Sequence, residues 1–227
     1  MSLQSVQNIL LASPHKNLLP FKNGQPITRG ILSLRKFLEN NEFGNLKRDQ
    51  ELQNKWGEGL LAGVGYLHSK GLVHGHLSLD CLSVDLRTDE LLVGHLNCCI
   101  NSSQLKSLDE VRVVSDRYAP PEKFNGDRVM ISTKTDVWAC GVLLYFIFNK
   151  KFAFDKAVKP TSAAPGCWFQ WHSLFDAKFL FEPKYSNLVV ALKQMLVTLP
   201  ENRLELKEIN ELLPLVVDFS DVNVSFD

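Results

Sequence analysis

The chain has 227 residues, 45% of them hydrophobic and 22% charged, which is the composition of a globular protein large enough to bury a sizeable core. Its 25 basic and 25 acidic residues cancel, so no net field favours nucleic acid or an anionic membrane as a partner. Five cysteines without a disulfide-framework spacing favour a reducing compartment, and we expect a cytoplasmic protein.

The N-terminal part of the chain predicts a short helix followed by a hairpin. The helix is expected at residues 1–12. Asn23-Gly24 favours a tight hairpin turn, which would join a strand at 18–21 to a return strand at 27–32.

Two helices of very different length are expected next. The shorter is predicted at 33–40, where Leu34, Phe37 and Leu38 share one face. The longer is predicted from about residue 47 to 69, because apolar residues recur there at spacings of three and four: Leu52, Trp56, Leu60, Val64 and Leu67.

The second half of the chain begins with two predicted short strands, near 82–85 and 91–93. Residues 98–122 show no clean period and are predicted to be a long loop. The run from Val137 to Phe148 is apolar throughout but shorter than the about 20 residues that span a bilayer, so it predicts a helix buried on all sides. Helices are expected at 136–149, 167–178, 186–198 and 204–213.

The most informative stretch runs from Tyr66 to Asp85. An apolar helix end precedes His74, and a short apolar strand begins after Cys81. This order resembles the catalytic loop of eukaryotic protein kinases, in which His-Arg-Asp-Leu-x-x-x-x-Asn lies between such elements. The resemblance implies that His74 packs the loop against the core.

The positions that handle charge in that family carry other residues here. His76 stands where the catalytic-base aspartate is expected, and Ser78 replaces the lysine that faces the phosphate. Cys81 replaces the metal-binding asparagine. Further along, the strand that resembles the approach to Asp-Phe-Gly is followed by His95, Leu96 and Asn97.

Two later motifs resemble structural parts of the same family. Tyr118-Ala119-Pro120-Pro121-Glu122 resembles the end of the activation segment, and the run that begins at Asp136 resembles the start of the central buried helix. The resemblance implies that Glu122 forms a buried ion pair with Arg203, and that Asp136 accepts backbone N–H bonds from the loop. The structural residues that it assigns are His74, Glu122, Asp136, Trp138, Gly141 and Arg203.

The fold class expected from this resemblance is α+β and mostly helical, a kinase-like large lobe with a truncated or remnant small lobe. Residues 1–32 would be the remnant, with a helix and two short strands, 33–215 the large lobe, and 216–227 an acidic tail. No Gly-x-Gly-x-x-Gly loop or lysine-bearing strand precedes the large-lobe motifs. Either the small lobe is reduced or the sequence is a truncated version of a longer one, and both alternatives stay open.

Phosphoryl transfer depends on metal ions and on charges that neutralise the phosphates, and these are the positions that differ. We therefore predict a pseudokinase that is not an enzyme and uses no cofactor. It would act as a scaffold or allosteric regulator of a protein partner, with an active kinase or a larger complex as candidates. The alternative is an active kinase, or one with residual nucleotide binding, whose catalytic groups are displaced, with Asp80 standing in for a lost carboxylate.

Two further sites are weighed against simpler explanations. His76, Cys81 and His95 offer soft ligands that suit zinc, but the same side chains could simply fill a disused site with hydrogen bonds, which is the favoured interpretation. Aromatic residues at 168, 171 and 175 would share one helix face and could dock a partner, although such stripes more often pack in a core. These partner-binding candidates are Trp168, Trp171 and Phe175.

Overall fold

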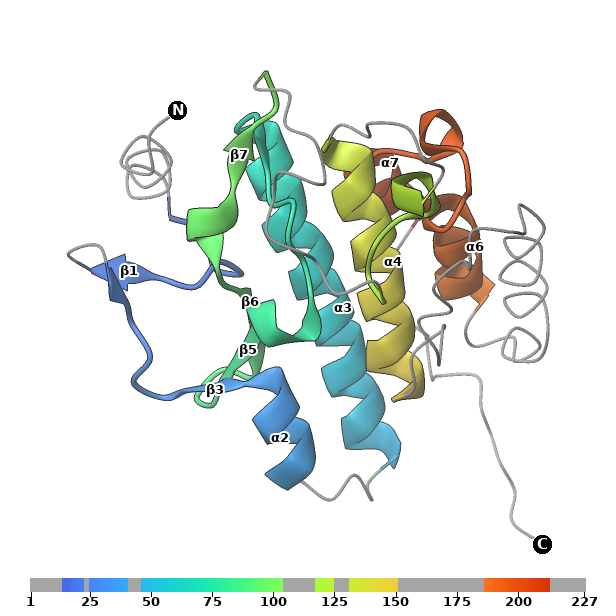
Figure 1. The fold of residues 1–227 in the computed structure, drawn as a ribbon. Coiled ribbons are helices and arrows are strands. Elements are labelled where there is room, and N and C mark those ends of the chain that lie inside the picture. Colours follow the sequence, from blue (N-terminus) through green and yellow to red (C-terminus); the bar gives the residue numbers. More distant parts are fainter. Residues whose placement is uncertain are drawn as a thin grey trace, which may run out of the picture.

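Two long helices, α3 (Leu46–Ser69) and α4 (Thr133–Asn149), form the centre of the molecule and run in opposite directions (Figure 1). The computed structural model describes residues 14–22, 25–40, 46–103, 117–124, 131–150 and 186–212. The apolar face of α3 packs against α4 on one side and against a small sheet on the other. The predicted period of three and four is confirmed, because Trp56, Leu60, Val64 and Leu67 are all buried.

Helix α4 is enclosed by the rest of the fold, as its apolar sequence predicts. Every residue from Thr135 to Ile147 is buried. The backbone N–H of Ser132 donates to Thr135 Oγ1 at 3.2 Å at the start of the helix, and Lys150 ends it in a left-handed conformation with φ 55°. Near this end, Nε2 of Gln53 on α3 donates to the carbonyl oxygens of Ile147 and Phe148, at 3.0 and 3.1 Å.

Short antiparallel strands lie beside α3. The largest sheet has the order β3 (Ile31–Ser33), β5 (Leu82–Asp85), β6 (Glu90–Val93), and β6 packs on α3. Two more pairs are β1 (Phe21–Lys22) with β2 (Gln25–Pro26), and β4 (Leu72–Val73) with β7 (Ile100–Asn101).

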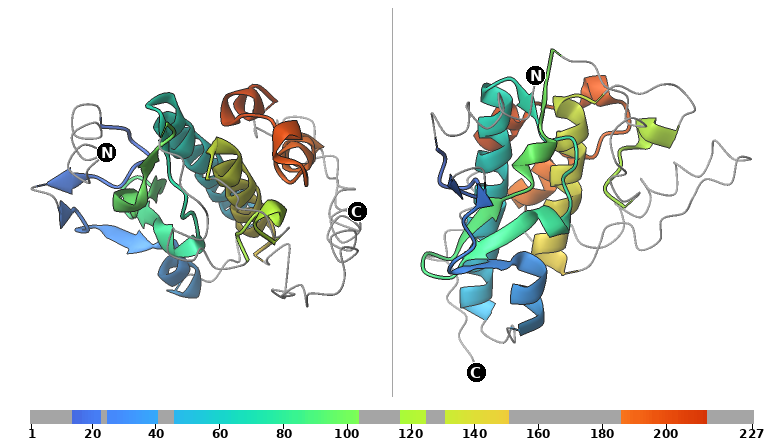
Figure 2. Two further views of the ribbon diagram at one scale, coloured as in Figure 1. Left: turned by 45° about the horizontal axis from the view of Figure 1, so that its top comes forward. Right: turned by 60° about the vertical axis from the view of Figure 1, so that its left-hand side comes forward.

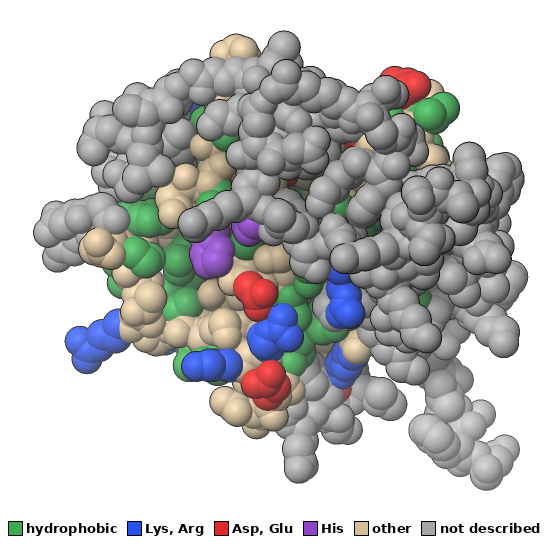
Figure 3. Space-filling model, viewed as in Figure 1, with side chains coloured by type: hydrophobic (Ala, Val, Ile, Leu, Met, Phe, Trp, Pro, Cys, Tyr) green, Lys and Arg blue, Asp and Glu red, His purple; other side chains and the backbone are tan. Residues whose placement is uncertain are grey.

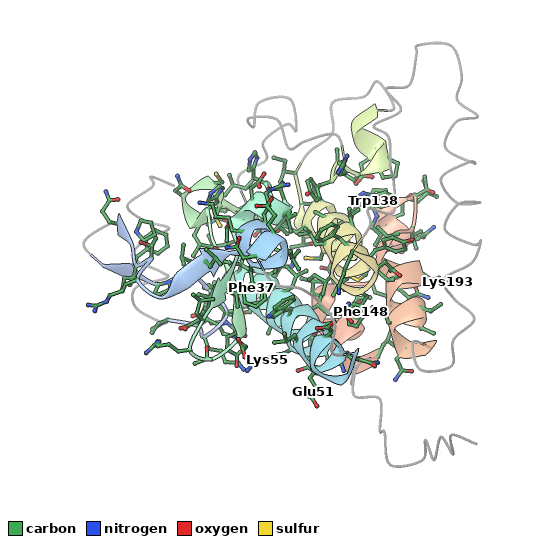
Figure 4. The ribbon with its side chains drawn as sticks, turned by 90° about the horizontal axis from the view of Figure 1, so that it is seen from below. Phe37, Glu51, Lys55, Trp138, Phe148 and Lys193 are labelled. Atoms are coloured by element: carbon green, nitrogen blue, oxygen red, sulfur yellow. The ribbon has the colours of Figure 1, made fainter. Side chains whose placement is uncertain are left out.

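Within the described ranges, three shorter helices flank the central pair. Helix α2 (Leu34–Asn40) packs on β5, while α6 (Ser186–Met195) and α7 (Leu206–Leu212) pack on α4 and α3 respectively. Viewed from below, α2 with Phe37 and α6 with Lys193 lie on opposite sides of the central helices (Figure 4). The left view of Figure 2 shows the same order, with the strands on one side of the central helices and α6 and α7 on the other.

The hairpin prediction was right in its antiparallel pairing and wrong at its return strand, and its turn residues Asn23 and Gly24 lie outside the described residues. Strands β1 and β2 pair across Asn23-Gly24, with Phe21 opposite Pro26. The predicted return strand at 27–32 is divided, because Ile31–Ser33 leaves the hairpin and pairs with β5. Gly30, at φ 76°, makes this change of direction possible, and its carbonyl oxygen accepts the N–H of Leu86 at 2.9 Å.

Other predictions along the chain are confirmed with shifted ends. Helices are present at 34–40, 46–69, 133–149, 186–195 and 206–212, and strands at 82–85 and 90–93. The predicted loop at 98–122 contains β7 and the short 3₁₀ helix Pro121–Phe124. The predicted helices at 1–12 and 167–178 and the acidic tail at 216–227 lie outside the described residues.

None of the described helices is both long enough and apolar enough to cross a membrane. The assignment of residues 1–32 to a small-lobe remnant stays a prediction, because the described part of that segment shows only the β1–β2 hairpin and the start of β3.

Gly141 is a point of close contact between α4 and the end of α6. A Cβ atom at this position would lie 2.8 Å from Leu196 Cδ2, 3.0 Å from Leu196 Cγ and 3.1 Å from Met195 Cβ. Both neighbours are buried, so neither can move aside without disturbing the core. The absence of a side chain is what lets these helices touch.

We expect Gly141→Ala to lower the free energy of unfolding by about 1–3 kcal/mol, because it overpacks this contact. Urea denaturation measures the change. The matched control is Gly65→Ala on α3, where a Cβ would meet Asn210 Nδ2 only at 3.8 Å. That variant should be neutral or stabilising by up to ~1 kcal/mol through helix propensity. Equal losses in both variants would contradict the packing argument.

Candidate functional site

The loop between β4 and β5 is held in shape by one buried carboxylate. Asp136, at the start of α4, accepts the backbone N–H of His74 at 2.7 Å and that of Gly75 at 2.8 Å. It also contacts His68 Nε2, at the end of α3, at 2.9 Å. The side chain of Asp136 is only 1% exposed, so these donors replace the water that the carboxylate would otherwise need. Asp136 therefore accepts backbone N–H bonds from the loop, as the sequence analysis expected.

His74 fixes the loop to the strand that follows it. Its imidazole is fully buried, Nε2 lies 2.9 Å from the Gly94 carbonyl oxygen, and Nδ1 accepts the N–H of His76 at 3.3 Å. Both contacts are satisfied by the neutral ring with its proton on Nε2. Burial lowers the pKa of His74 from its ordinary value of 6.5, with Asp136 acting in the opposite direction.

Cys81 lies at the end of a 3₁₀ turn, Leu79–Cys81, within the cluster of replaced positions. Its Sγ donates to the carbonyl oxygen of His76 at 3.2 Å, and lies 3.4 Å from Ser78 Oγ and 3.6 Å from His95 Nδ1. Burial raises the pKa of the Cys81 thiol to about 11. The group at this position is therefore a neutral thiol at physiological pH.

The three residues after Gly94 face different environments. His95 is exposed and takes a left-handed conformation with φ 55°, which starts the 3₁₀ turn Leu96–Cys98. Leu96 is buried in the core, whereas Asn97 is exposed.

The structure thus brings together three of the replaced positions by their side chains: Ser78, Cys81 and His95. His76 joins them through its backbone oxygen. In the part of the chain that the structure describes, no three His, Cys, Asp or Glu side chains are arranged to hold a metal ion. The zinc triad of His76, Cys81 and His95 is therefore not assembled, and the hydrogen-bonded alternative matches the observed contacts.

Asp80, the candidate replacement carboxylate, is turned toward α2. Its Oδ1 lies 3.0 Å from Arg35 Nη2 and accepts Arg35 Nε–H at 3.1 Å. Both side chains are at least half exposed, so the pair contributes little to stability. On the face drawn in Figure 3, described acidic and basic side chains lie intermixed near exposed histidines, and neither sign gathers into a patch.

The expected ion pair between Glu122 and Arg203 is present and bidentate. Arg203 Nη1 and Nη2 donate to the two carboxylate oxygens of Glu122 at 2.7 and 2.5 Å. The guanidinium lies 5.0 Å from the ring centroid of Trp138 on α4. It also donates to three backbone oxygens, those of Lys134, Val197 and Thr198. This buried cluster joins the 121–124 turn to α4 and to the 196–203 connection.

Sequence reasoning missed two side chains that shape the site. His68 supports Asp136 from α3, and Arg35 holds Asp80 from α2. The only available signal for His68 was a histidine in an otherwise apolar helix end, which is too common to single it out. The partner-binding candidates Trp168, Trp171 and Phe175 lie outside the described residues and stay predictions.

Residues 30–212 match the sequence profile of the protein kinase domain. The chain belongs to this family. The described helices and small antiparallel sheets are those of a partial kinase fold.

Curated kinases from yeasts are similar to this kinase domain. A kinase of Saccharomyces cerevisiae named fatty acyl-CoA synthetase and RNA processing-associated kinase 1 is 30% identical over 155 residues, which cover 67% of this chain and 18% of that protein. Serine/threonine-protein kinase KIN4 of the same yeast is 29% identical over 66% of this chain and 19% of its own length. The carbon catabolite-derepressing protein kinase of Candida glabrata is 27% identical over a region that covers 80% of this chain and 28% of that protein. The chain thus matches less than a third of the length of these relatives.

We expect Glu122→Gln to lower the free energy of unfolding by about 3–5 kcal/mol, because it leaves the fully buried Arg203 guanidinium without its counter-charge. Chemical denaturation measures the loss. The control is Arg87→Ala, which removes an exposed ion pair with Asp85 and should leave the midpoint almost unchanged. A loss no larger than that of the control would contradict the assigned role of the pair.

Cys81 should resist alkylation in the folded protein. With a pKa of about 11, roughly one molecule in a thousand carries a Cys81 thiolate near pH 8, and the side chain is buried. Iodoacetamide labelling followed by peptide mass spectrometry should find the half-exposed Cys98 modified before Cys81. In denaturant the two should react alike. Rapid labelling of native Cys81 would contradict the thiol's buried, neutral state.

Proposed function

We propose that this kinase domain is catalytically inactive and acts by binding a protein partner, as a scaffold or an allosteric regulator. The observation that carries the proposal is the chemistry at Cys81. Where the family places a metal-binding amide, this chain has a buried neutral thiol, satisfied by Ser78, His95 and the His76 carbonyl. A neutral thiol is a poor ligand for Mg²⁺, which requires hard oxygen donors.

The other replaced positions support the same conclusion. His76 and His95 put imidazoles where the family has carboxylates, so the loop offers neither the catalytic base nor the second metal ligand. Without bound metal, the charge that develops on a transferring phosphoryl group would not be neutralised. A protein with this loop would have to stabilise that charge by other groups.

Three structural features of the described part of the domain, in contrast, are present. The Asp136 carboxylate holds the loop, the Glu122–Arg203 pair holds the 121–124 turn, and the buried Leu96 packs in the core. A fold that keeps its scaffold while losing its charged groups still offers a surface for recognition. The proposed partner is an active kinase or a larger complex. The proposed location is the cytoplasm.

The second candidate is an active or nucleotide-binding kinase with displaced catalytic groups. The relatives carry the word kinase in their names, and the exposed Asp80 carboxylate lies within the loop between β4 and β5. To serve as a base, Asp80 would have to leave Arg35, and an exposed pair of this kind costs little to break. Direct measurement decides between the two functions.

Thermal unfolding with and without saturating ATP and Mg²⁺ tests the proposal. A ligand at 100 times its dissociation constant would stabilise the fold by about 2.7 kcal/mol, and we expect no such stabilisation of the wild-type chain. The matched control is the double variant Cys81→Asn with His95→Asp, which restores hard oxygen ligands. A wild-type stabilisation of about 2.7 kcal/mol would contradict the proposal, whatever the double variant does. So would phosphotransfer to a generic substrate that is abolished by replacing His76 or His95.

A further inference from the structure

Residues 15–19, here called the strap, lie along the end of β6 as a short additional strand. The carbonyl oxygen of Asn17 accepts the N–H of Val93, and the N–H of Leu19 donates to the Val93 carbonyl oxygen, both at 2.8 Å. Leu18 forms a parallel bridge with Val93 and is only 6% exposed. Since β5 pairs with the opposite edge of β6, the strap occupies the edge that the sheet leaves open.

Two glycines of α3 let the strap lie directly on the helix. Gly59 and Gly63 are four residues apart and therefore share one helix face. A Cβ atom at Gly59 would lie 2.8 Å from Asn17 Nδ2, and one at Gly63 would lie 2.8 Å from the Asn17 carbonyl oxygen. This face of α3 and the open edge of β6 together form a receiving surface, which fits an extended segment with an asparagine at its centre.

The Asn17 side chain is bonded through its nitrogen but not through its oxygen. It is fully buried, and Nδ2 donates to the Leu91 carbonyl oxygen at 3.0 Å and to Glu90 Oε2 at 3.3 Å. Its Oδ1 is also buried and has no hydrogen-bond partner among the described residues. A buried acceptor without a donor raises the free energy of the docked state. Release of the strap removes this cost, so docking is specific in its contacts and still reversible.

The connection from the strap to the rest of the domain is exposed. After the β1–β2 hairpin, which packs Phe21 against the core, the chain reaches β3 through residues 27–30. All of residues 25–30 are exposed, and Gly30 turns the chain with φ 76°. Such a connection can straighten without exposing buried side chains. The strap and the hairpin therefore form one unit that is joined to the domain by a hinge.

We propose that this unit exchanges between two copies of the chain, so that the strap of each copy docks on α3 and β6 of the other. The occupant of the receiving surface is the same segment in both cases, so the bonds to Val93 and Leu91 and the contacts with the two glycines are all reproduced. Exchange of an identical element in this way is a low-cost route to a dimer. The inference concerns the fold and holds whether or not the domain transfers phosphate.

Protein concentration decides between the closed monomer and the exchanged dimer, because both contain the same contacts. A short flexible connection gives the strap of the same chain an effective concentration on the order of 1 mM. Dilute protein should therefore be monomeric, and the dimer should appear as the protein concentration approaches this value.

Two lysines that approach one carboxylate make the exchange measurable in the wild-type chain. Nζ of Lys16, on the strap, lies 3.4 Å from Glu90 Oε1, and Nζ of Lys55, on α3, lies 3.8 Å from the same oxygen. A carbodiimide joins such an amine and carboxylate directly as an amide. The Lys16–Glu90 product reports which copy supplies the strap. The Lys55–Glu90 product is the matched control, because both of its residues belong to the receiving surface side of a single copy.

The test uses equal amounts of ¹⁴N and ¹⁵N full chain, refolded together at about 1 mM, separated by gel filtration and then cross-linked. In the dimer fraction we expect about half of the Lys16–Glu90 products to join a ¹⁴N peptide to a ¹⁵N peptide, because the two labels combine at random. The Lys55–Glu90 products should carry a single isotope throughout. Absence of a dimer, or a dimer whose Lys16–Glu90 products carry a single isotope, would overturn the proposal.

The length of the hinge gives a second test. Deletion of the exposed residues Thr28 and Arg29 strains the docking of the strap on its own chain but leaves docking on a second copy unhindered. We expect the ratio of dimer to monomer, measured by light scattering at about 0.1 mM, to rise roughly tenfold or more.

The matched control lengthens the same hinge. Two glycines inserted between Thr28 and Arg29 relax the connection and should leave the chain monomeric at that concentration. A shortened variant that stays monomeric, or an equal rise of the dimer in the lengthened variant, would count against the exchange.

Discussion

The Asp136 carboxylate is the constraint on which the rest of the structure depends. It lies at the first turn of the most buried helix and receives three donors, two from the loop backbone and one from His68. Two of these donors are peptide N–H groups, which every residue other than proline provides. These two bonds therefore hold the loop backbone whatever side chains stand at 76, 78 and 81, and those residues can change while the course of the backbone remains.

Because the loop backbone is held independently of these side chains, the chain can combine the structure of the kinase family with altered residues in the loop. The chain is a member of the protein kinase family by its sequence profile, and its helices, ion pair and loop backbone agree with that membership. At the same time its loop presents imidazole, hydroxyl and thiol groups in mutual contact, and burial keeps the Cys81 thiol neutral. This replacement of the family's carboxylate and amide groups is the basis of the proposed binding function.

Much of the fold could be predicted from the sequence, because apolar spacing determines which faces are buried. The period in α3 and the uniform apolarity of α4 are of this kind, whereas the Glu122–Arg203 pair was implied by the resemblance to the protein kinase family. The division of the return strand at Gly30 could not be predicted, since it depends on pairing with β5, more than fifty residues away in sequence. For the same reason the partners of Asp80 and Asp136 on α2 and α3 were missed: a single arginine or histidine carries no pattern.

The amide of Gln53 has a consequence for how the two central helices can move. It donates from one nitrogen to two carbonyl oxygens at the last turn of α4, where the helix dipole is negative. A glutamate of the same size would set an acceptor against acceptors and a negative charge against that dipole. If α4 slid along α3 by one residue, the Gln53 amide would lose both of these carbonyl oxygens. The contact therefore fixes the axial position of α4 relative to α3, in addition to the apolar packing between the two helices.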